Sequence, residues 1–514
     1  MPAPVQFLKR SPESVTLSMR LGRTLVFALI FICFCGCIKA GPDYQSGSGA
    51  AVAPGLYVNQ EPLRPEKSEK TPYTDSWWTG LNNPELNALV EEALANNPDI
   101  RAAAARVLEY RAVLAQARAG LFPSVSLSGE GSWSEATSTS STPVLTSQGI
   151  SYVRRERDVH STSLDLTAAA SYELDLWGRI ARSNEAARAD LLAVEENART
   201  VAQTIAAETV SAYLEIENLR RRIAITQESI EDFKRNLSFI QRRYEGGIAS
   251  VLDLRQARRL LAQAESLLPP LRRDMKAKAA ALAVLAGKYP NLEFTRKIPK
   301  DYYKALPPVP PGLPSDLLLR RPDVRQAEAG LQAASARIGV ARAARFPSIS
   351  LTGALGTSSP DLEDLFSPEN RFWNLAAGLL APIYDAGELK AAEEAARARF
   401  AREEAAYAKT VLSAFAEVES ALAAQKEQRE YRELLLKLVE ESAATRETAQ
   451  SRYEQGLSTY LDVLDAQQAL YSAQQTLINS ELAIYLNRVT LYRALGGGWP
   501  ASEKKPKGSE SKQE

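Results

Sequence analysis

The 514-residue sequence predicts an α+β membrane protein, in which a transmembrane β-barrel with four strands per chain continues into a long α-helical barrel. Three observations predict this class. The chain repeats itself once, each copy contains helical stretches far longer than those of globular domains, and each copy contains two strands with one apolar face. We therefore expect two tandem structural repeats, each made of a helix, a β-hairpin and a long helical hairpin.

The composition argues against a nucleic-acid-binding protein and against an enzyme. The 62 Lys and Arg residues balance the 62 Asp and Glu residues, which leaves no charge excess to attract phosphate backbones. The single histidine, His160, argues against His-based metal sites and His-driven acid–base catalysis. Because the sequence also lacks a Gly-rich phosphate loop and a nucleophile with a nearby base, we expect no enzyme, no metal, no cofactor and no nucleic-acid partner.

The N-terminus predicts a lipoprotein signal peptide over residues 1–36, with translation starting at Met1 or Met19. Its apolar run, Leu25 to Phe34, has the length of a signal-peptide core and is too short to span a membrane as a helix. The run ends in Phe-Cys-Gly-Cys37, which resembles a bacterial lipobox, so Cys37 is expected to carry diacylglycerol and an N-acyl chain. Ile38 at the next position, in place of Asp, favours the outer membrane. A cysteine that lies in an apolar segment by chance is the alternative.

The repeats become visible when the chain is aligned with itself. Residues 97–101 and 117–129 recur 224 positions later, and residues 243–253 recur 209 positions later. The chain is therefore predicted to have six parts. The signal peptide, residues 1–36, is followed by a lipidated N-terminal extension (37–83) and the first repeat (84–288). A Pro-rich linker (289–320), the second repeat (321–496) and a disordered polar tail (497–514) complete the chain. The change of offset means that the first copy carries extra residues, which fall in the Ser- and Thr-rich stretch 132–149. That composition predicts an exposed loop there.

Each repeat contains a short, a very long and a medium helical stretch. These are predicted over 97–120, 181–245 and 252–286 in the first copy, and over 321–345, 389–455 and 461–495 in the second. A 65-residue helix measures about 100 Å, and a short and a medium helix placed end to end measure about 90 Å. We therefore expect one long helix to lie beside two shorter helices stacked in series. A purely structural coiled coil explains the helices equally well.

The strands favour a membrane channel. Beginning at Val125, Leu164, Ile349 and Trp373, four segments of about 9 to 13 residues alternate apolar with mostly polar side chains, as tilted membrane-spanning strands do. Four strands cannot close a barrel, and open edges in lipid leave backbone groups without hydrogen bonds, so other chains must complete the barrel. A soluble sheet with one wet face is the alternative.

The combination of motifs resembles a TolC-type outer membrane efflux lipoprotein, over about residues 37–496. The resemblance rests on the duplicated architecture, the lipobox, Gly41-Pro-Asp-Tyr44, and the segment from Leu313 to Val324 with its Arg-Arg-Pro-Asp-Val end. It implies a homotrimer in the outer membrane of a Gram-negative bacterium, lipid-anchored and extending into the periplasm. The implied partners are outer membrane lipid, a periplasmic adaptor (membrane fusion protein) and an inner-membrane pump of the resistance-nodulation-division class. A passive exit channel for small molecules is the implied function; a periplasmic scaffold or adaptor without a barrel is the alternative.

Two glycine-containing sites mark the ends of the long helical hairpins. Gly246 and Gly247 in the first copy, and Gly456 in the second, interrupt the helices where a tight turn needs positive φ. By resemblance, these turns, together with Leu457 and Ser458, form the periplasmic entrance and contact the adaptor. Turn chemistry alone explains the glycines equally well. The TolC type places an arginine at the position of Ser458.

Four residues near these turns are candidate gate residues by resemblance. Asp462 and Asp465 match paired aspartates that ring the closed entrance, while Asp253 and Tyr453 match positions that bond between neighbouring helices in the closed state. Clustered carboxylates in a narrow pore repel anions and favour cations. Capping of the following helices also explains Asp253 and Asp462. Asp465 lies one turn beyond the cap, and its first-copy counterpart is Gln256.

Overall fold

The computed structural model describes residues 39–45, 57–59, 76–146, 149–291, 303 and 320–497. The chain divides into two compact units, and we describe each by itself. The first comprises the residues up to 45, 111–189 and 332–402, and contains the β-sheet; the second comprises the remaining residues and is helical. Each unit takes segments from both copies of the sequence repeat, so the compact units do not coincide with the repeats.

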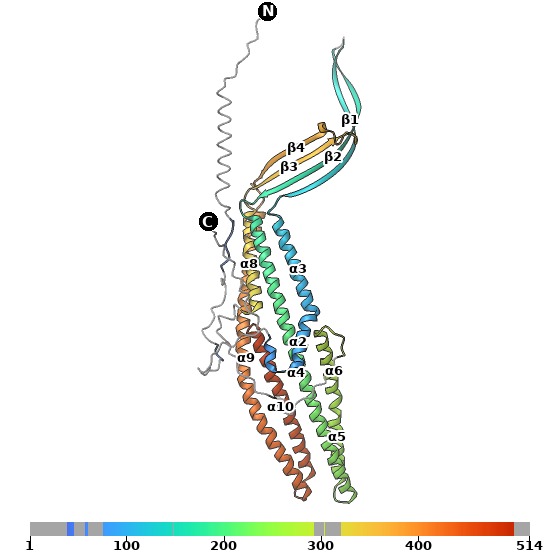
Figure 1. The fold of residues 1–514 in the computed structure, drawn as a ribbon, viewed down its shortest axis with the longest axis vertical. Helices are drawn as coiled ribbons and strands as arrows, with labels where there is room; N and C mark the ends of the chain where they lie inside the picture. Colours follow the sequence, from blue (N-terminus) through green and yellow to red (C-terminus); the bar gives the residue numbers. More distant parts are fainter. Residues whose placement is uncertain are drawn as a thin grey trace, which may run out of the picture. The chain divides into compact units, whose positions relative to one another are not determined.

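Helices account for most of both copies (Figure 1). The first copy contains α2 (Pro84–Asn96), α3 (Pro98–Ala119), α4 (Arg179–Glu245), α5 (Val251–Ser266) and α6 (Leu268–Leu285), and the second contains α8 (Pro322–Ala343), α9 (Glu388–Glu454) and α10 (Tyr460–Ala494). The described residues also contain two short 3-10 helices, η1 (Trp77–Leu81) and η2 (Pro368–Asn370). The bounds of the two 67-residue helices, α4 and α9, agree with the prediction from periodicity to within two residues at each end.

Both long helices begin with the same arrangement. At the start of α4, the Asp175 carboxylate accepts hydrogen bonds from the backbone N–H groups of Ile180 and Ala181. At the start of α9, Asp385 accepts them from Gly387 and Leu389, each at 3.0 Å. A carboxylate here satisfies N–H groups that have no partner within the helix and interacts favourably with the helix dipole.

The short and medium helices are joined by side chains that bind the last carbonyls of the helix before them. In the first copy the buried Asn97 amide, just before α3, donates to the carbonyl of Leu285 at the end of α6 (2.9 Å). In the second copy Arg321, just before α8, donates to the carbonyl of Ala494 at the end of α10 (3.0 Å). These are equivalent positions of the two repeats, and the contacts support the predicted stacking of shorter helices in series.

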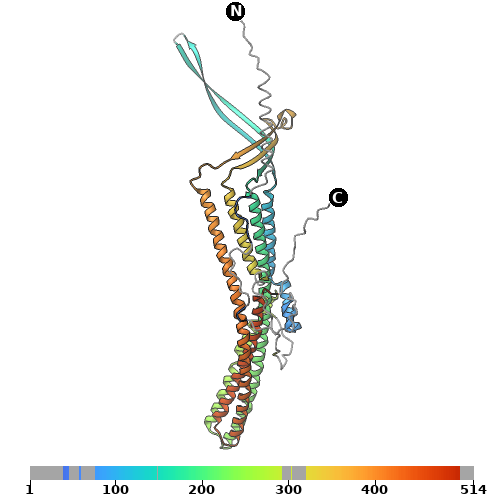
Figure 2. The ribbon, with the colours of Figure 1, turned by 90° about the vertical axis from the view of Figure 1, so that its left-hand side faces the viewer.

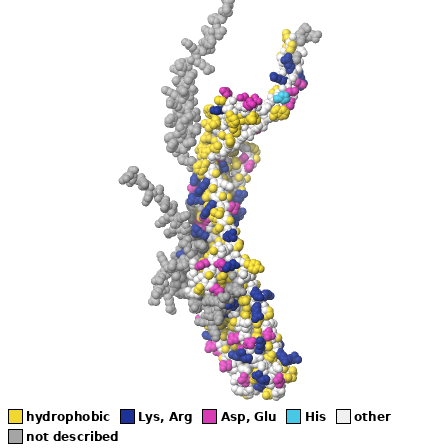
Figure 3. Space-filling view, turned by 45° about the vertical axis from the view of Figure 1, so that its right-hand side comes forward, with side chains coloured by type: hydrophobic (Ala, Val, Ile, Leu, Met, Phe, Trp, Pro, Cys, Tyr) yellow, Lys and Arg dark blue, Asp and Glu magenta, His cyan; other side chains and the backbone are white. Residues whose placement is uncertain are grey.

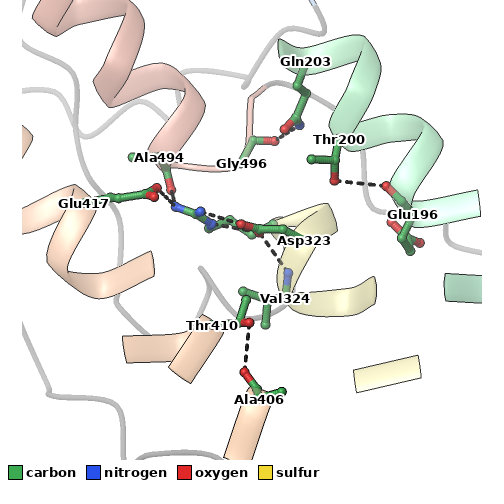
Figure 4. A network of polar contacts seen from close by, with 11 residues as sticks. Glu196, Thr200, Gln203, Asp323, Val324, Ala406, Thr410, Glu417, Ala494 and Gly496 are labelled. Atoms are coloured by element: carbon green, nitrogen blue, oxygen red, sulfur yellow. Dashed lines mark hydrogen bonds and ion pairs between the residues drawn. The ribbon is translucent and has the colours of Figure 1, made fainter. Parts of the chain in front are cut away.

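The second junction is a charged network. The Arg321 guanidinium, 8% exposed, also binds Asp323 through two nitrogens (3.0 and 2.6 Å) and Glu417 on α9 (2.8 Å). Figure 4 labels three of its partners, Asp323, Glu417 and Ala494, which come from α8, α9 and α10. A buried guanidinium is stable only while its hydrogen-bond partners offset the loss of hydration. Because Arg321 meets these partners only where it lies now, the network fixes the start of α8.

The first medium helix differs from the prediction. The sequence pattern predicts one helix over 252–286, but the structure contains two, α5 and α6, separated at Leu267. Pro269 and Pro270 at the start of α6 have no N–H to donate to the preceding turn, which ends α5. The equivalent stretch of α10 contains no proline and is a single 35-residue helix.

The sheet has four antiparallel strands in the order β1-β2-β3-β4: β1 (Ser124–Thr146), β2 (Gly149–Leu174), β3 (Ser348–Ser359) and β4 (Arg371–Leu380). Its register aligns the predicted apolar positions of all four strands on one face. One such row consists of Leu127, Ala168, Leu355 and Trp373, and the next of Val125, Ala170, Gly353 and Leu375. The alternation predicted from sequence is therefore confirmed. β4 ends at Leu380, because Pro382 cannot continue the ladder.

The predicted loop at 132–149 is wrong, because most of that stretch forms strands. β1 and β2 remain paired, from Ser134↔Ser161 to Thr146↔Gly149, after β3 has ended opposite Leu164. Figure 2 shows this two-stranded extension, which we call the ribbon, continuing beyond β3 and β4. The Ser- and Thr-rich composition that predicted a loop is also compatible with a strand. Threonine is β-branched and therefore favours strands, and the described serine and threonine side chains of the ribbon are exposed to water.

The helical unit has separate apolar clusters between its helices. One cluster contains Trp77, Leu86, Val90, Val210, Tyr213, Ile216, Leu282 and Val489, from η1, α2, α4, α6 and α10. Here the Tyr213 hydroxyl donates to Glu85 (2.7 Å) and accepts from Asn83 (3.0 Å). Burial raises the pKa of Tyr213 and keeps it neutral. None of the helices in the described part of the chain is both long enough and apolar enough to span a lipid bilayer.

Candidate functional site

Two turns at the ends of the helical hairpins carry the predicted site residues. The first tip, residues 246–250, connects α4 to α5, and the second tip, residues 455–459, connects α9 to α10. Gly247 (φ +74°) and Gly456 (φ +76°) end the long helices in the left-handed conformation. Gly246 does not have positive φ, so of the first pair only Gly247 is required by the backbone.

The two tips use the same hydrogen-bond pattern. In the first, the N–H of Ile248 donates to the carbonyl of Arg243 (2.8 Å) and that of Gly247 to Tyr244 (2.9 Å). In the second, Leu457 donates to Arg452 (2.8 Å) and Gly456 to Tyr453 (3.0 Å). This paired arrangement is the Schellman motif, which satisfies the last carbonyls of a helix. The conformation of both glycines is thus explained by helix termination.

Two of the predicted gate aspartates form capping boxes. Asp253 accepts from the backbone N–H of Ser250 (3.0 Å), whose hydroxyl accepts from Asp253 N–H (3.1 Å). Asp462 accepts from both the backbone N–H (2.9 Å) and the hydroxyl (2.8 Å) of Thr459. These contacts begin α5 and α10 and follow from the spacing in the sequence.

Asp465 stands apart from this capping chemistry. Its side chain is exposed on α10, three residues after Asp462, and within the described residues it makes no hydrogen bond or ion pair. Asp462 is exposed as well. The second tip therefore presents two carboxylates to solvent on one helix, whereas the first presents only Asp253, which is half-buried.

Tyr453, the fourth predicted residue, belongs to an apolar cluster that joins the two hairpins. The other members of this cluster come from α4, α5 and α10 and include Phe233, Ile240, Leu254, Leu260, Tyr460, Val463 and Leu464. The Tyr453 ring lies 5.3 Å from that of Tyr460 and 6.5 Å from that of Phe239. Burial raises the pKa of both tyrosines, and the nearby charge of Asp253 adds to this, so both hydroxyls stay neutral at physiological pH.

Arg243 is a site residue that the sequence does not reveal. Its guanidinium, on α4, lies over the ring of Tyr453 on α9 (5.1 Å to the centroid) and over that of Phe239 (5.6 Å). The attraction between a cation and an aromatic face links the two hairpins of one chain. Arg243 opposes the effect of burial on the pKa of Tyr453. The repeat alignment pairs Arg243 with Arg452, whose guanidinium instead reaches the carbonyl of Leu457 (3.4 Å), so the alignment gave no signal.

The tips also expose apolar side chains. Leu457 is 61% exposed and Ile248 is 69% exposed, and the first turns of α5 and α10 add Val251, Leu252 and Leu461. An open groove of about 730 Å³ between the end of α9 and the start of α10 is lined by Arg452, Leu457, Ser458 and Asp462, among others. The Ser458 hydroxyl is buried without a hydrogen-bond partner in the described structure. Exposed apolar side chains clustered at a turn are typical of a surface that binds another protein.

The predicted lipidation site, Cys37, lies outside the described residues, but the segment that follows it is anchored to the sheet-containing unit. The Arg182 side chain, only 2% exposed, binds the carbonyls of Ala40 and Gly41 and pairs with Asp43 (2.7 Å). The Cα of Gly339 would lie 2.5 Å from a Cβ at Gly41, so only glycine fits there. The chain next to Cys37 therefore has a fixed place on this unit.

The described residues contain no group of three or more His, Cys, Asp or Glu side chains arranged to hold a metal ion. What the tips offer is an exposed pair of carboxylates, an apolar surface and a cation–aromatic contact between hairpins. The described part of the tips thus combines negative charge, an exposed apolar surface and a contact between helices of the two hairpins.

Sequence comparison identifies relatives of known role. The family model described as "Outer membrane efflux protein" matches residues 89–288 and 313–497. The solvent efflux pump outer membrane protein SrpC of Pseudomonas putida is 37% identical over 430 residues, covering 82% of this chain and 87% of SrpC. The cation efflux system protein CusC of Escherichia coli O6:H1 is 33% identical over 423 residues, covering 82% and 88% of the two chains.

A solved structure of an outer membrane channel has a similar fold. The open state of the MtrE outer membrane channel of Neisseria gonorrhoeae matches with a TM-score of 0.76 and 29% identity, covering 90% of this chain and 98% of MtrE. The resemblance to TolC-type proteins predicted from the motifs is confirmed, as is the expectation of a non-enzymatic protein. The chain belongs to the outer membrane efflux protein family.

Proposed function

We propose that three copies of this chain form the gated exit channel of a tripartite efflux pump. The chain itself is an outer membrane efflux channel of Gram-negative bacteria. The proposal concerns its assembly, gating and attachment. The observation that carries it is the four-stranded antiparallel sheet, whose outer strands β1 and β4 are both free edges in one chain.

The physical argument for assembly starts from the exposed face of that sheet. Leu127, Leu375 and Trp373 are 73%, 77% and 76% exposed. Exposing these apolar side chains to water costs free energy, whereas contact with lipid does not. A strand edge in lipid loses backbone hydrogen bonds worth several kcal/mol each, so β1 of one copy must pair with β4 of another. Figure 3 shows hydrophobic side chains gathered over the sheet. Three copies supply twelve strands, the number implied by the resemblance to TolC-type proteins.

Mass measurement tests the assembly. The full-length protein, extracted in detergent, is expected to have the mass of three chains and to form conducting pores when added to a planar lipid bilayer. A monomer that stays soluble without detergent, or a trimer that never conducts, would contradict the proposal and favour a periplasmic scaffold.

For gating, we infer that the second tip narrows the entrance with Asp462 and Asp465 while Tyr453, Asp253 and Arg243 hold the hairpins together. Three copies would bring six exposed carboxylates of α10 close to one axis, where they favour cations over anions. The contact of Arg243 with Tyr453 ties α4 to α9 within each chain. The open state named for MtrE supports an entrance with more than one state.

Single-channel recording tests the gate. The double variant Asp462→Ala/Asp465→Ala is expected to raise conductance and reduce cation preference, because the carboxylates and their hydrated counterions leave the constriction. A single Gln256→Ala variant, at the first-copy counterpart of Asp465, is the matched control and is expected to conduct like the wild type. Unchanged conductance and ion preference in the double variant would rule out the gate assignment.

The partners follow from the same geometry. The exposed apolar residues at both tips suit a periplasmic adaptor, which would connect the channel to an inner-membrane pump of the resistance-nodulation-division class. Acyl chains on Cys37 would add an anchor to outer membrane lipid. SrpC is named for solvent efflux and CusC for cation efflux, so related channels serve very different cargo, and we infer that the pump selects the substrate.

A further inference from the structure

The ribbon formed by the ends of β1 and β2 has two chemically different faces. In an antiparallel pair, residues directly opposite each other point to the same side, and alternate residues of each strand share a face. Residues 134–146 of β1 extend about 44 Å at 3.4 Å per residue. No other strand in the described structure pairs with this part of β1 or β2, so both faces and both edges are exposed.

One face is electrically balanced by its own contacts. Arg154 pairs with Glu156 (3.5 Å), and the hydroxyl of Thr137 donates to Asp158 (2.8 Å). His160 lies 3.8 Å from Glu135 on the opposite strand. All three acidic residues of the ribbon are on this face, and each has a polar neighbour there.

The other face is basic and lacks acids. It carries Arg155 and Arg157, which are exposed and, within the described residues, have no carboxylate partner. Arg155 is opposite Ser140, and Arg157 is opposite Ser138. Two arginines whose Cα atoms are about 7 Å apart along one strand thus lie opposite two serines on the next.

This combination fits a phosphorylated sugar. Guanidinium groups bind phosphate oxygens through two parallel hydrogen bonds, and hydroxyls exchange hydrogen bonds with saccharide hydroxyls. The balanced opposite face would not compete for the phosphate. Figure 3 shows dark blue side chains on the ribbon, all of which are arginine.

We propose that the Arg155–Arg157 face of the ribbon binds phosphate groups in the saccharide part of lipopolysaccharide, the phosphorylated glycolipid of the outer leaflet. This rests on the proposed barrel, which places the ribbon on the external side of the membrane, because the helices leave the sheet from its other end. A ribbon about 44 Å long reaches through the sugar layer next to the lipid. A trimer carries three such faces, so weak individual contacts add up to firm attachment.

The probe for this proposal is the deacylated, phosphorylated core oligosaccharide of lipopolysaccharide, which is soluble and cannot partition into detergent. Its binding to the full-length trimer is measured by isothermal titration calorimetry. Arg155→Gln/Arg157→Gln is expected to weaken binding about tenfold or more, because two charge-assisted contacts are lost. Arg154→Gln, next to Arg155 but on the balanced face, is the matched control and is expected to bind within about twofold of the wild type.

Further measurements separate this proposal from the proposed function. The oligosaccharide with its phosphates removed is expected to bind no better than the double variant does. All variants are expected to conduct like the wild type in a bilayer that contains only glycerophospholipids. Equal binding of both oligosaccharides, an equal loss in Arg154→Gln, or no binding by a conducting wild-type trimer would each overturn the phosphate site and leave the channel intact. A wild-type protein that does not conduct would instead contradict the channel.

Discussion

At the scale of single residues, the tips combine roles that the sequence predicts with one that it hides. The spacing of Ser250 with Asp253 and of Thr459 with Asp462 predicted caps, and the structure contains them. Asp465 lies beyond the cap in the sequence, and its side chain makes no capping contact among the described residues. Its role in the gate stays a prediction.

Arg243 carries the sharpest prediction at this scale. Arg243→Gln removes the cation above the Tyr453 ring and is expected to cost about 1 kcal/mol of attraction between the hairpins, which corresponds to roughly fivefold more time in open states. Single-channel open probability measures it. Arg452→Gln, at the equivalent position of the second repeat, removes the same charge without touching an aromatic ring. An equal effect of both variants would mean that general charge, and not the contact, matters.

Arg243 could not be found from sequence for a physical reason. Its partner Tyr453 is 210 positions away, and a contact between a cation and a ring has no periodic or spacing signature. Hydrogen-bonded caps, by contrast, form between residues at a fixed short spacing, so the capping role of Asp253 and Asp462 can be predicted from the sequence. Local chemistry at the tips was therefore predictable, and the contact that joins the hairpins was not.

At the scale of elements, the turns give a clean comparison between adjacent glycines. Gly247→Ala puts a Cβ on a residue with φ +74° and is expected to destabilise the protein by about 1 kcal/mol. Gly246→Ala, one residue earlier and without positive φ, is expected to be neutral or to stabilise by up to about 0.5 kcal/mol. The thermal unfolding midpoints of the two variants test this. A larger loss in Gly246→Ala would contradict the assignment of the turn.

A second prediction at this scale concerns the start of α9. The N–H groups of Leu389 and Gly387 hold the pKa of Asp385 below its ordinary value. The ionised form therefore stabilises the folded state above the ordinary carboxyl pKa of about 4, and this contribution disappears as the pH falls through the folded-state pKa. Asp385→Asn is expected to lower the unfolding midpoint at pH 7 and to differ less from the wild type below pH 4. Asp361→Asn, in an exposed loop, is the control and is expected to leave the unfolding midpoint at pH 7 close to that of the wild type.

The elements differ in how much of them the sequence predicted. The bounds of the two long helices are predicted to within two residues, because neither 67-residue stretch contains a glycine or proline that would interrupt a helix. The break at Leu267 was visible in Pro269 and Pro270, but helical periodicity on both sides favoured one helix. The ribbon was missed because neither of its faces is buried, so its sequence has no apolar alternation to signal a strand.

At the scale of the whole molecule, the attachment of the N-terminus gives a prediction. Cys37→Ser is expected to abolish the incorporation of labelled palmitate, because only this cysteine would remain after signal-peptide cleavage. Cys35→Ser, which leaves with the signal peptide, is expected to keep the label and is the matched control. Labelling followed by gel electrophoresis measures both. Retention of the label in Cys37→Ser would mean that the lipid is attached to a residue other than Cys37.

The pairing of β2 with β3 sets the order in which the membrane part can be completed. The partners Leu174↔Ile349 and Leu164↔Ser359 are 175 to 195 residues apart in the sequence, whereas only two residues separate the end of β1 from the start of β2. At 5 to 20 residues per second, β3 leaves the ribosome about 10 to 40 seconds after β2. Throughout that time the first hairpin has an apolar face and an unpaired edge, and a two-stranded hairpin alone is barely stable. Because β3 and β4 lie in the second repeat, we expect the half-made sheet to need protection from aggregation until that repeat has been synthesised.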